Sequence, residues 1–317
     1  GEPKVGFRVD IDALWQQVDG EFQANHSCGH DGHMTVGLGV AISLKEIENE
    51  LPYAVRIIFQ PAEETGQGAK AVLKTGLIDP LQFLFGMHVR PLVELELGTY
   101  AATIEHGAAR LVTGEIKGTE AHGARPEQGI NAIEVASALV EGMKRIWINP
   151  LESASIKMTN LQAGGLSTNI IPGKATFSVD IRAQKNKVMD QLVEQFEKVI
   201  KSVRTLYDVD IYYQFDSAIV AAQTDEVAKQ CLEDAIKEVA GEEKLVSSLL
   251  SPGGEDFHYY TYEKPQLQAS MLGLGCGVVP GLHHPEMTYD RKYLKPGVEI
   301  IVAAIKKALK GIESSDQ

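Results

Sequence analysis

Residues 25–40, NHSCGHDGHMTVGLGV, gather side chains that bind metal ions and then turn apolar. Cys28 and His30 stand two positions apart, a spacing that helix periodicity does not explain. Thiolate and imidazole groups are both good zinc ligands, and imidazole also binds manganese, cobalt and nickel. A single histidine or cysteine is usually structural, so this cluster by itself leaves open a turn of small residues with incidental histidines. His33 follows on the same side of a predicted helix, and we expect it to pack or hydrogen-bond nearby.

A pair of carboxylates offers a second set of ligands. Glu63 and Glu64 closely follow residues 53–60, YAVRIIFQ, whose alternating and β-branched pattern is typical of a strand. Adjacent side chains cannot both face one direction, so one of the two could bind an ion while the other points into a cleft. The simpler interpretation is a solvated helix start, where the helix dipole favours glutamate.

Further histidines complete the pattern. His88 ends an apolar strand predicted over residues 81–89, and His283 and His284 lie in a loop bounded by glycine and proline, GLHHPEM. A histidine at a strand end is often a core residue whose hydrogen bonds are satisfied. A Cys/His pair, a Glu pair, a strand-end histidine and a loop histidine in one chain nevertheless fit a two-metal hydrolase better than chance.

The order of the predicted strands and helices that carry these residues indicates two kinds of fold in one chain. Strands alternate with helices in the first third of the chain, which predicts an α/β fold with a mixed, mostly parallel sheet. Functional side chains in such sheets gather at the carboxyl ends of the strands, where the candidate ligands lie. The middle third reads βαββαβ, which is typical of a ferredoxin-like α+β unit with an antiparallel sheet.

We therefore predict a catalytic metal-binding domain formed by residues 1–108 and 218–317, and an inserted lid or dimerisation domain over residues 109–217. Hinges at the two boundaries would allow the insert to close over a substrate. The stretch LGLGCG, residues 272–277, lacks the spacing of a nucleotide-binding loop and is interpreted as a turn.

Composition limits the classes of partner. The 317 residues are 44% hydrophobic and 23% charged, as in a soluble globular protein. A formal net charge of −13 argues against nucleic acid and anionic membranes as partners, and no apolar run reaches the ~18 residues of a membrane span. Three widely spaced cysteines predict no disulfide framework, so a cytoplasmic location is expected. The chain opens almost directly on a strand-like run, so an N-terminal segment could precede it.

Motifs spread over nearly the whole length resemble those of a known family. They are, in order, FRVDIDAL, CGHDGH, IIFQPAEETGQGA, GMHVRP, GTEAHGARPEQGINAI, NIIPGKATFSVDIR, GGEDF and LHHPEM. The chain resembles the dinuclear metallohydrolases that include aminoacylase, carboxypeptidase G and hippurate hydrolase. It is most similar to the branch that hydrolyses N-acyl amino acids.

The resemblance implies a role for each matching residue. Two divalent ions per subunit (Mn²⁺, Zn²⁺, Co²⁺ or Ni²⁺) would be held by five ligands, Cys28, His30, Glu64, His88 and His283. In the last motif the family has a histidine, a small polar residue and a proline. That order makes His283 the ligand and puts His284 in the small polar position, and the choice between the two stays open.

Catalytic and substrate-binding residues are also implied by the resemblance. Glu63 would be the general acid/base and Asp12 would orient a metal ligand. His122 would stabilise the oxyanion in the active site of the partner subunit of a homodimer formed through the inserted domain. Asn169 and Arg182 would grip the substrate, since an arginine can hold a carboxylate with two parallel hydrogen bonds. From its residue pattern alone, Arg182 is a surface strand residue.

The expected activity is hydrolysis of the amide bond of a small N-acyl amino acid, hippurate-like or N-acetylated, by a metal-activated water. One alternative is an aminopeptidase or dipeptidase of the same fold. A second is a metal-storage or sensing protein, which would leave the Glu63–Glu64 pair without a purpose. A third is a degenerate binding protein, although no expected catalytic position is replaced. His106 and His258 are interpreted as structural, and the acyl group, amino acid and metal are not indicated.

Overall fold

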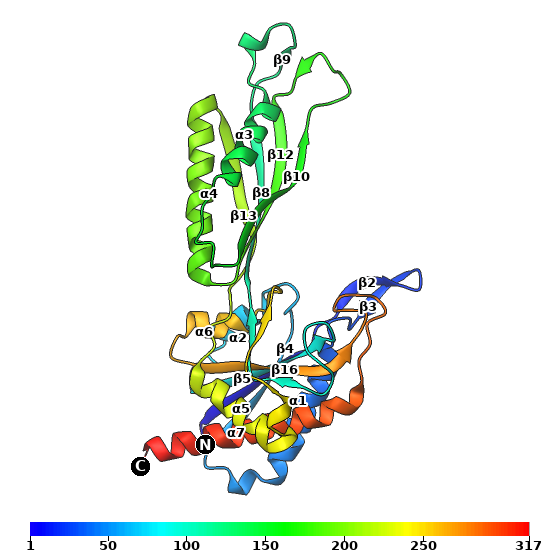
Figure 1. The fold of residues 1–317 in the computed structure, drawn as a ribbon, viewed down its shortest axis with the longest axis vertical. Helices are drawn as coiled ribbons and strands as arrows, with labels where there is room; N and C mark the ends of the chain where they lie inside the picture. The colour runs from blue at the N-terminus through cyan, green and yellow to red at the C-terminus, as the bar shows by residue number, and fades with distance from the viewer. Residues whose placement is uncertain (317) are drawn as a thin grey trace. The chain divides into compact units, whose positions relative to one another are not determined.

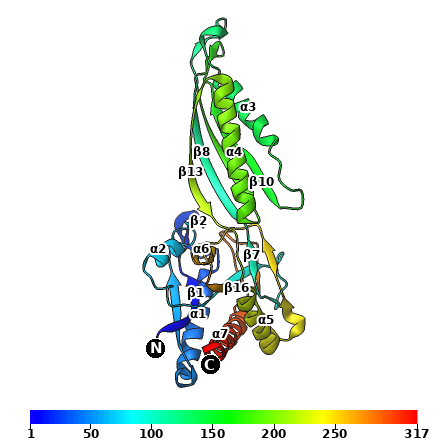
Figure 2. The same cartoon turned by 90° about the vertical axis from the view of Figure 1, so that its left-hand side faces the viewer.

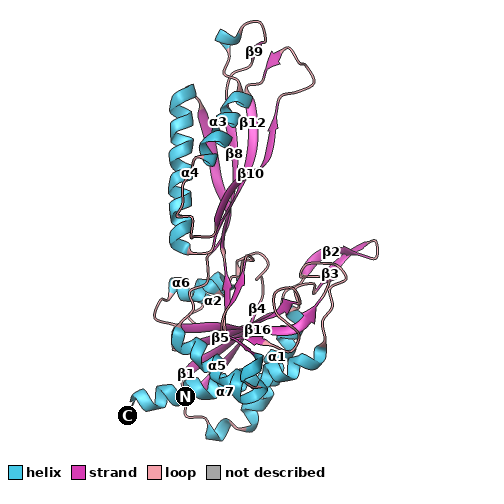
Figure 3. Cartoon of the chain, in the orientation of Figure 1, coloured by secondary structure: helices cyan, strands magenta, loops and turns pink. Residues whose placement is uncertain are grey.

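The computed structural model describes residues 1–316, which divide into two compact units. The first unit comprises residues 1–106 and the chain from Ala222 onward, and the second comprises Gly107–Ala221. The second unit therefore extends beyond the predicted insert of residues 109–217 at both ends. Both units combine helices with strands, as Figure 3 shows.

The first unit contains strands on both sides of the insert. Its strands are β1 (Pro3–Asp10), β2 (Leu14–Val18), β3 (Glu21–Asn25), β4 (Ala54–Gln60), β5 (Phe83–Pro91), β6 (Tyr100–Ala101), β7 (Ile104–His106), β14 (Leu245–Val246), β15 (Leu249–Ser251) and β16 (Gln268–Val278). Its helices are α1 (His30–Glu46), α2 (Gly68–Lys74), α5 (Glu226–Ala240), α6 (His258–Glu263) and α7 (Leu294–Asp316).

A six-stranded sheet in the order β14-β6-β16-β5-β1-β4 forms the centre of this unit. β1 pairs in parallel with β4 and β5, and β5 pairs in parallel with β16. Only the short β6 runs antiparallel to its neighbour β16, while it pairs in parallel with β14. The predicted α/β fold with a mixed, mostly parallel sheet is confirmed.

The sheet separates an apolar layer from a layer that carries charge. Val5, Phe7 and Val9 of β1 are buried in the main core with residues of α1, α5 and α7. Arg8 and Asp10 alternate with them and are also fully buried, so they lie on the other face of the strand. Figures 1 and 2 show α2 and α6 on that other side of the sheet.

The prediction of a turn at residues 272–277 is wrong, because this stretch lies within β16. Its glycines allow close packing: a Cβ atom at Gly275 would lie 2.3 Å from the carbonyl oxygen of Glu96. A Cβ atom at Gly273 would lie 2.9 Å from that of Ala101. A glycine-rich pattern that is typical of a loop therefore occurs in a central strand, because neighbouring segments approach its backbone.

The second unit has the predicted βαββαβ order. Its elements are β8 (Ala108–Lys117), β9 (Ala121–His122), α3 (Ala132–Lys144), β10 (Ala154–Ala163), β11 (Ile170–Ile171), β12 (Lys174–Ala183), α4 (Asn186–Tyr207) and β13 (Asp210–Ile219). The strands form an antiparallel sheet in the order β10-β12-β8-β13, and β9 pairs with β11 separately. Buried residues of α3 and α4 form a core with one face of this sheet. The predicted ferredoxin-like fold is confirmed.

None of the helices among residues 1–316 combines the length and the apolar character that a membrane span requires.

Candidate metal centre

The five predicted ligands lie together in the first unit. The ligand atoms of Cys28, His30 and His88 are within 4.8 Å of one another, and so are those of Cys28, Glu64 and His283. Because Cys28 belongs to both groups, the five side chains form two adjoining sets of ligands. The residues come from four segments that are far apart in the sequence.

Local backbone conformation presents the first ligand pair. Gly29 adopts φ 86° directly before α1, so the chain turns sharply between Cys28 and His30, the first residue of the helix. A Cβ atom on Gly29 would lie 2.4 Å from the Val89 side chain, which only glycine avoids. Cys28 and His30 are both buried and reach the carboxyl end of β5, where His88 lies.

The loop that carries His283 is fixed by contacts with residues near Cys28. The His283 main-chain N–H donates to the carbonyl oxygen of Ser27 at 2.8 Å, and the Gln16 amide donates to the carbonyl oxygen of His283 at 2.9 Å. His283 itself adopts φ 66°, an unusual conformation for a non-glycine residue. Its Nε2 lies 3.4 Å from Oε2 of Glu64.

Hydrogen bonds orient two of the imidazole rings in the same way. Nδ1 of His30 lies 3.0 Å from the main-chain oxygen of Asp12, and Nδ1 of His88 lies 2.6 Å from that of Val89. A carbonyl oxygen only accepts, so each Nδ1 carries a hydrogen, and whenever the ring is neutral its Nε2 keeps a lone pair. This tautomer is the one that a histidine with its Nε2 on a metal requires.

The centre contains buried polar atoms that lack partners. Among residues 1–316, Nε2 of His30 and Oε1 of Glu64 are buried without a hydrogen bond, and they lie 4.0 Å apart. Burial lowers the pKa of His30, but the hydrogen bond with Asp12 and the charges of Asp10 and Glu64 outweigh it and raise that pKa to about 9. The surroundings therefore stabilise positive charge at this point, and the donor set fits a divalent cation.

Glu63 lies beside the ligands and has a different environment from Glu64. Glu63 Oε1 is 3.4 Å from the main-chain N–H of Asp256, and its carboxylate faces Glu255. Burial and the negative charge of Glu255 raise the pKa of Glu63 well above its ordinary value. A carboxyl group with a raised pKa can both accept and return a proton near neutral pH.

A buried network beneath the centre was not predicted from the sequence. The Arg8 guanidinium is fully buried and donates to Asp10 at 2.8 Å and to Asp256 at 2.7 Å, and it lies 3.0 Å from Glu255. Gln60 also donates to Asp256, at 2.8 Å. Two signals could have indicated this network: Arg8 and Asp10 alternate within an otherwise apolar strand, and the motif GGEDF received no role.

Histidines near the centre differ in their contacts. His284 Nδ1 accepts the N–H of Glu286 at 3.1 Å, and His284 belongs to no group of clustered ligand atoms in the described chain. His33 is buried and hydrogen-bonded through both ring nitrogens, as expected. His106 and His258 form a separate buried pair with their ring nitrogens 3.0 Å apart.

The remaining predicted residues belong to the second unit. His122 and Asn169 are neighbours: His122 pairs with Ile170 across β9 and β11, and the N–H of Gly123 donates to the Asn169 carbonyl at 2.7 Å. Arg182 is 46% exposed at the far end of β12, where it forms an ion pair of 2.7 Å with Asp180. The eight-residue step from Lys174, at the near end of β12, to Arg182 spans about 26 Å of strand. Within this unit, Arg182 is therefore remote from the other two.

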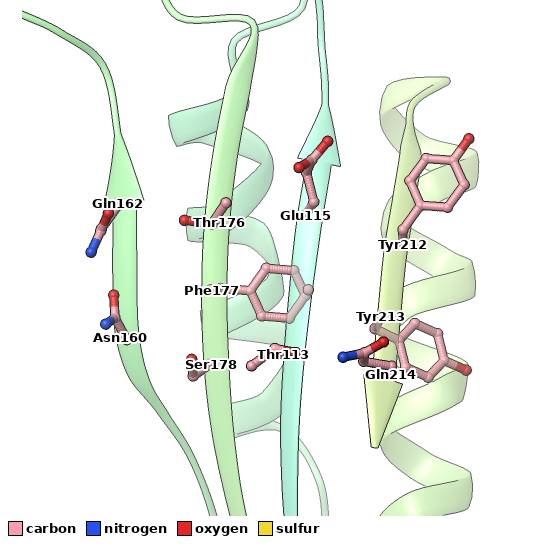
Figure 4. Close-up of a pocket in the computed structure, with 11 residues that line it drawn as sticks. Thr113, Glu115, Asn160, Gln162, Thr176, Phe177, Ser178, Tyr212, Tyr213 and Gln214 are labelled. Carbon is pink, nitrogen blue, oxygen red and sulfur yellow. The ribbon is translucent and has the colours of Figure 1, made fainter. Parts of the chain in front are cut away.

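A pocket lies on the sheet of the second unit, and its lining differs from the metal-ligand cluster of the first unit (Figure 4). It measures about 400 Å³ and is lined by polar side chains that include Glu115, Asn160 and Tyr212. None of the predicted site residues lines it, although the structure describes all of them. Because the predicted metal ligands cluster in the first unit, that cluster is the candidate metal centre.

Comparison with known proteins gives consistent matches over more than nine-tenths of the chain. The model of peptidase family M20/M25/M40 matches residues 6–307. The N-acetylcysteine deacetylase of Bacillus subtilis is 30% identical over 307 residues, which cover 92% of this chain and 78% of that protein. One subunit of the p-aminobenzoyl-glutamate hydrolase of Escherichia coli is 28% identical over 322 residues, which cover 94% of this chain and 72% of that protein.

Solved structures share the fold. A dinuclear metal-binding peptidase of the M20 family from Bacillus subtilis superimposes with a TM-score of 0.82 at 26% identity, covering 98% of this chain and 82% of that chain. An aminobenzoyl-glutamate utilization protein from Klebsiella pneumoniae gives a TM-score of 0.73 at 24% identity, covering 96% and 72%.

Proposed function

Because the chain belongs to peptidase family M20/M25/M40 and is a hydrolase of amide bonds, we propose that it removes the acyl group from small N-acyl amino acids in a metal-dependent reaction. The observation that supports this function most directly is the cluster of Cys28, His30, Glu64, His88 and His283 with Glu63 beside it. Relatives named for N-acetylcysteine and p-aminobenzoyl-glutamate hydrolysis support the substrate class.

The five clustered side chains would be the ligands of two divalent ions, as the name of the dinuclear relative suggests. Such ions, when bound, supply a water molecule of lowered pKa and polarise the substrate carbonyl. Cys28 would bind as a thiolate, which metal binding itself would keep deprotonated. Asp12 would hold His30 with its Nε2 directed at the ion, through the hydrogen bond that its main-chain oxygen accepts.

Glu63 would move the protons of the reaction. It would accept a proton from the attacking water and return it to the nitrogen of the leaving amino acid. Its buried position and the neighbouring Glu255 favour the protonated form that this second step needs. Glu64, its neighbour in the sequence, lies 4.0 Å from His30 and is also 3.4 Å from His283, so the adjacent carboxylates would divide ligation from proton transfer.

Residues of the second unit would bind the substrate. From the family resemblance, His122 would stabilise the oxyanion, and Asn169 and Arg182 would hold the amino-acid part. The remoteness of Arg182 from His122 within the unit supports contributions from two subunits, with a homodimer formed through the second unit. The cysteines among the described residues are all free, which fits the reducing, cytoplasmic location that we propose.

A release assay tests the proposed function. The chelated protein would be reconstituted with Mn²⁺ or Zn²⁺ and offered a panel of N-acetyl and N-benzoyl amino acids beside dipeptides with a free amine. We expect metal-dependent release of amino acid from the acylated substrates. Activity on the dipeptides alone would identify an aminopeptidase or dipeptidase, and tight metal binding without any hydrolysis would identify a storage protein.

A further inference from the structure

His33, the last histidine of the CGHDGH motif, is fully buried, and both of its ring nitrogens are engaged. Nε2 accepts the main-chain N–H of Val89 at 3.0 Å. Since that group can only donate, Nε2 carries no hydrogen, and Nδ1 must carry it and donate it to the carboxylate of Asp10. His33 therefore has no lone pair left for a metal ion.

Val89 connects His33 to the ring of His88. Its N–H is held by His33, and its carbonyl oxygen accepts the Nδ1 hydrogen of His88 at 2.6 Å. The carbonyl thereby fixes both the tautomer and the direction of the His88 ring. The other ring nitrogen, Nε2, is hydrogen-bonded to the sulfur of Cys28 at 3.5 Å.

The other end of this chain of hydrogen bonds is anchored. Asp10 receives a second donor, the Arg8 guanidinium, at 2.8 Å, and neither side chain is exposed to solvent. Arg8 is held in turn by Asp256 at 2.7 Å. A path of directed hydrogen bonds thus runs from Arg8 through Asp10, His33 and Val89 to His88.

We propose that His33 is a positioning residue: together with Asp10 it fixes the backbone of Val89, whose carbonyl orients His88 toward the metal. This inference rests on the proposed function, because His88 would be a ligand only if the centre binds metal. It assigns a purpose to the one histidine of the motif that cannot bind the ion. Any buried histidine needs hydrogen-bond partners, so the tests below measure the His88 tautomer and the metal affinity, which a purely structural role of His33 would leave unchanged.

The first test uses the unaltered protein without metal. Long-range ¹H–¹⁵N NMR of the histidine rings reports which nitrogen carries the hydrogen. We expect His33 and His88 both to be neutral with the hydrogen on Nδ1. Hydrogen on Nε2 of either ring would overturn the proposal, whatever the variants do.

The second test compares His33→Leu with His33→Gln. Leucine removes both hydrogen bonds, whereas glutamine offers an amide donor for Asp10 and an amide oxygen for Val89. Loss of such an outer partner typically weakens metal binding roughly 10- to 100-fold. We expect that loss in His33→Leu, measured by zinc titration against a chromogenic chelator, together with a mixture of His88 tautomers, and substantial recovery in His33→Gln.

His106→Leu is the matched control, since it removes another buried histidine that lies outside this path. Unchanged zinc affinity in His33→Leu, or an equal loss in His106→Leu, would overturn the proposal. Absence of zinc binding by the unaltered protein would instead refute the proposed function, so the two failures are distinguishable. If His33→Leu does not fold, the tautomers of the unaltered protein and the affinity of His33→Gln still decide the question.

Discussion

The sulfur of Cys28 lies 3.5 Å from Nε2 of His88, although the two residues are 60 positions apart in the sequence. Neither group is charged without metal: burial and the carboxylates of Glu64 and Glu63 raise the pKa of Cys28 well above its ordinary value. Burial is the main cause that keeps the pKa of His88 well below its ordinary value. A cation at this point would convert the thiol to a thiolate and would gain two ligands at once.

We therefore expect Cys28→Ser to bind metal at least about tenfold more weakly, since loss of even an outer partner of a metal site typically costs that much. Elemental analysis after dialysis gives the metal content per chain. Cys231→Ser is the control, because Cys231 is half-buried on α5 and belongs to no clustered ligand group in the described residues. Equal metal content in both variants would remove Cys28 from the ligand set.

Substitution of the two adjacent glutamates should impair different properties, turnover in one case and metal binding in the other. Glu63→Gln is expected to retain metal and to lose roughly 10²- to 10⁴-fold in kcat, the usual contribution of a general acid/base. Glu64→Gln is expected to lose metal first, because the Glu64 carboxylate lies within 4.0 Å of His30 and 3.4 Å of His283. Metal content and kcat measured on the same preparations separate the two. Near-normal turnover by Glu63→Gln would mean that another group moves the proton.

The neighbouring loop histidines provide a third comparison. His283 Nε2 faces Glu64, whereas His284 closes a local turn with Glu286. We expect His283→Ala to weaken metal binding and His284→Ala to leave it unchanged. Calorimetric zinc titration of the two variants measures this directly. The opposite order would assign the ligand to His284 and would require the loop to rearrange.

The sequence contained enough information for the fold and for the grouping of the ligands. β-branched alternation and apolar runs marked β4 and β5 as strands, and parallel strands bring their carboxyl ends to one edge. Glu64 and His88 were expected to meet for that reason. Which of two adjacent residues points inward depends on backbone dihedrals, such as the positive φ of His283, that residue types alone do not specify.

The buried network of charged residues was not predicted from the sequence. Arg8 and Asp10 looked like ordinary strand residues, because the partners that make their burial tolerable, Glu255 and Asp256, lie some 245 residues further along. A buried ion network of this kind depends on tertiary contacts rather than on local pattern. For the same reason residues 272–277 of β16 were wrongly predicted to form a turn, since the segments that pack closely against their glycines come from a distant part of the chain.

Gly29 should tolerate no side chain. In Gly29→Ala the new Cβ atom would clash with Val89, and the φ of 86° would cost a further ~1–2 kcal/mol. We expect lower stability in urea and weaker zinc binding, because Cys28 and His30 flank the turn. Gly20→Ala is the control: its φ is 88°, but no atom lies within 4 Å of the added Cβ. A loss of zinc affinity equal to that of Gly20→Ala would show that the contact with Val89 is unimportant.

The buried pair of His106 and His258 predicts how stability changes with pH. Burial, followed by the charge of Arg8, lowers the pKa of His258 from 6.5 to about 3. Between these values the unfolded chain binds a proton at this position and the folded chain does not. The free energy of unfolding should therefore fall as pH decreases from 6.5 toward 3, by about 1.4 kcal/mol per pH unit from this residue.

His258→Gln removes that contribution. At pH 8 the variant should be less stable than the unaltered protein, because the substitution removes the hydrogen bond between His258 and His106. Below pH 6.5 its stability should depend less steeply on pH, because the titrating group is gone. Urea unfolding at pH 5, 6, 7 and 8 gives the difference between the two proteins at each pH, and carboxylates elsewhere cancel in that difference. His284→Gln, at an exposed position, is the control. A constant difference across the series would mean that His258 has the same pKa in the folded protein as in the unfolded chain.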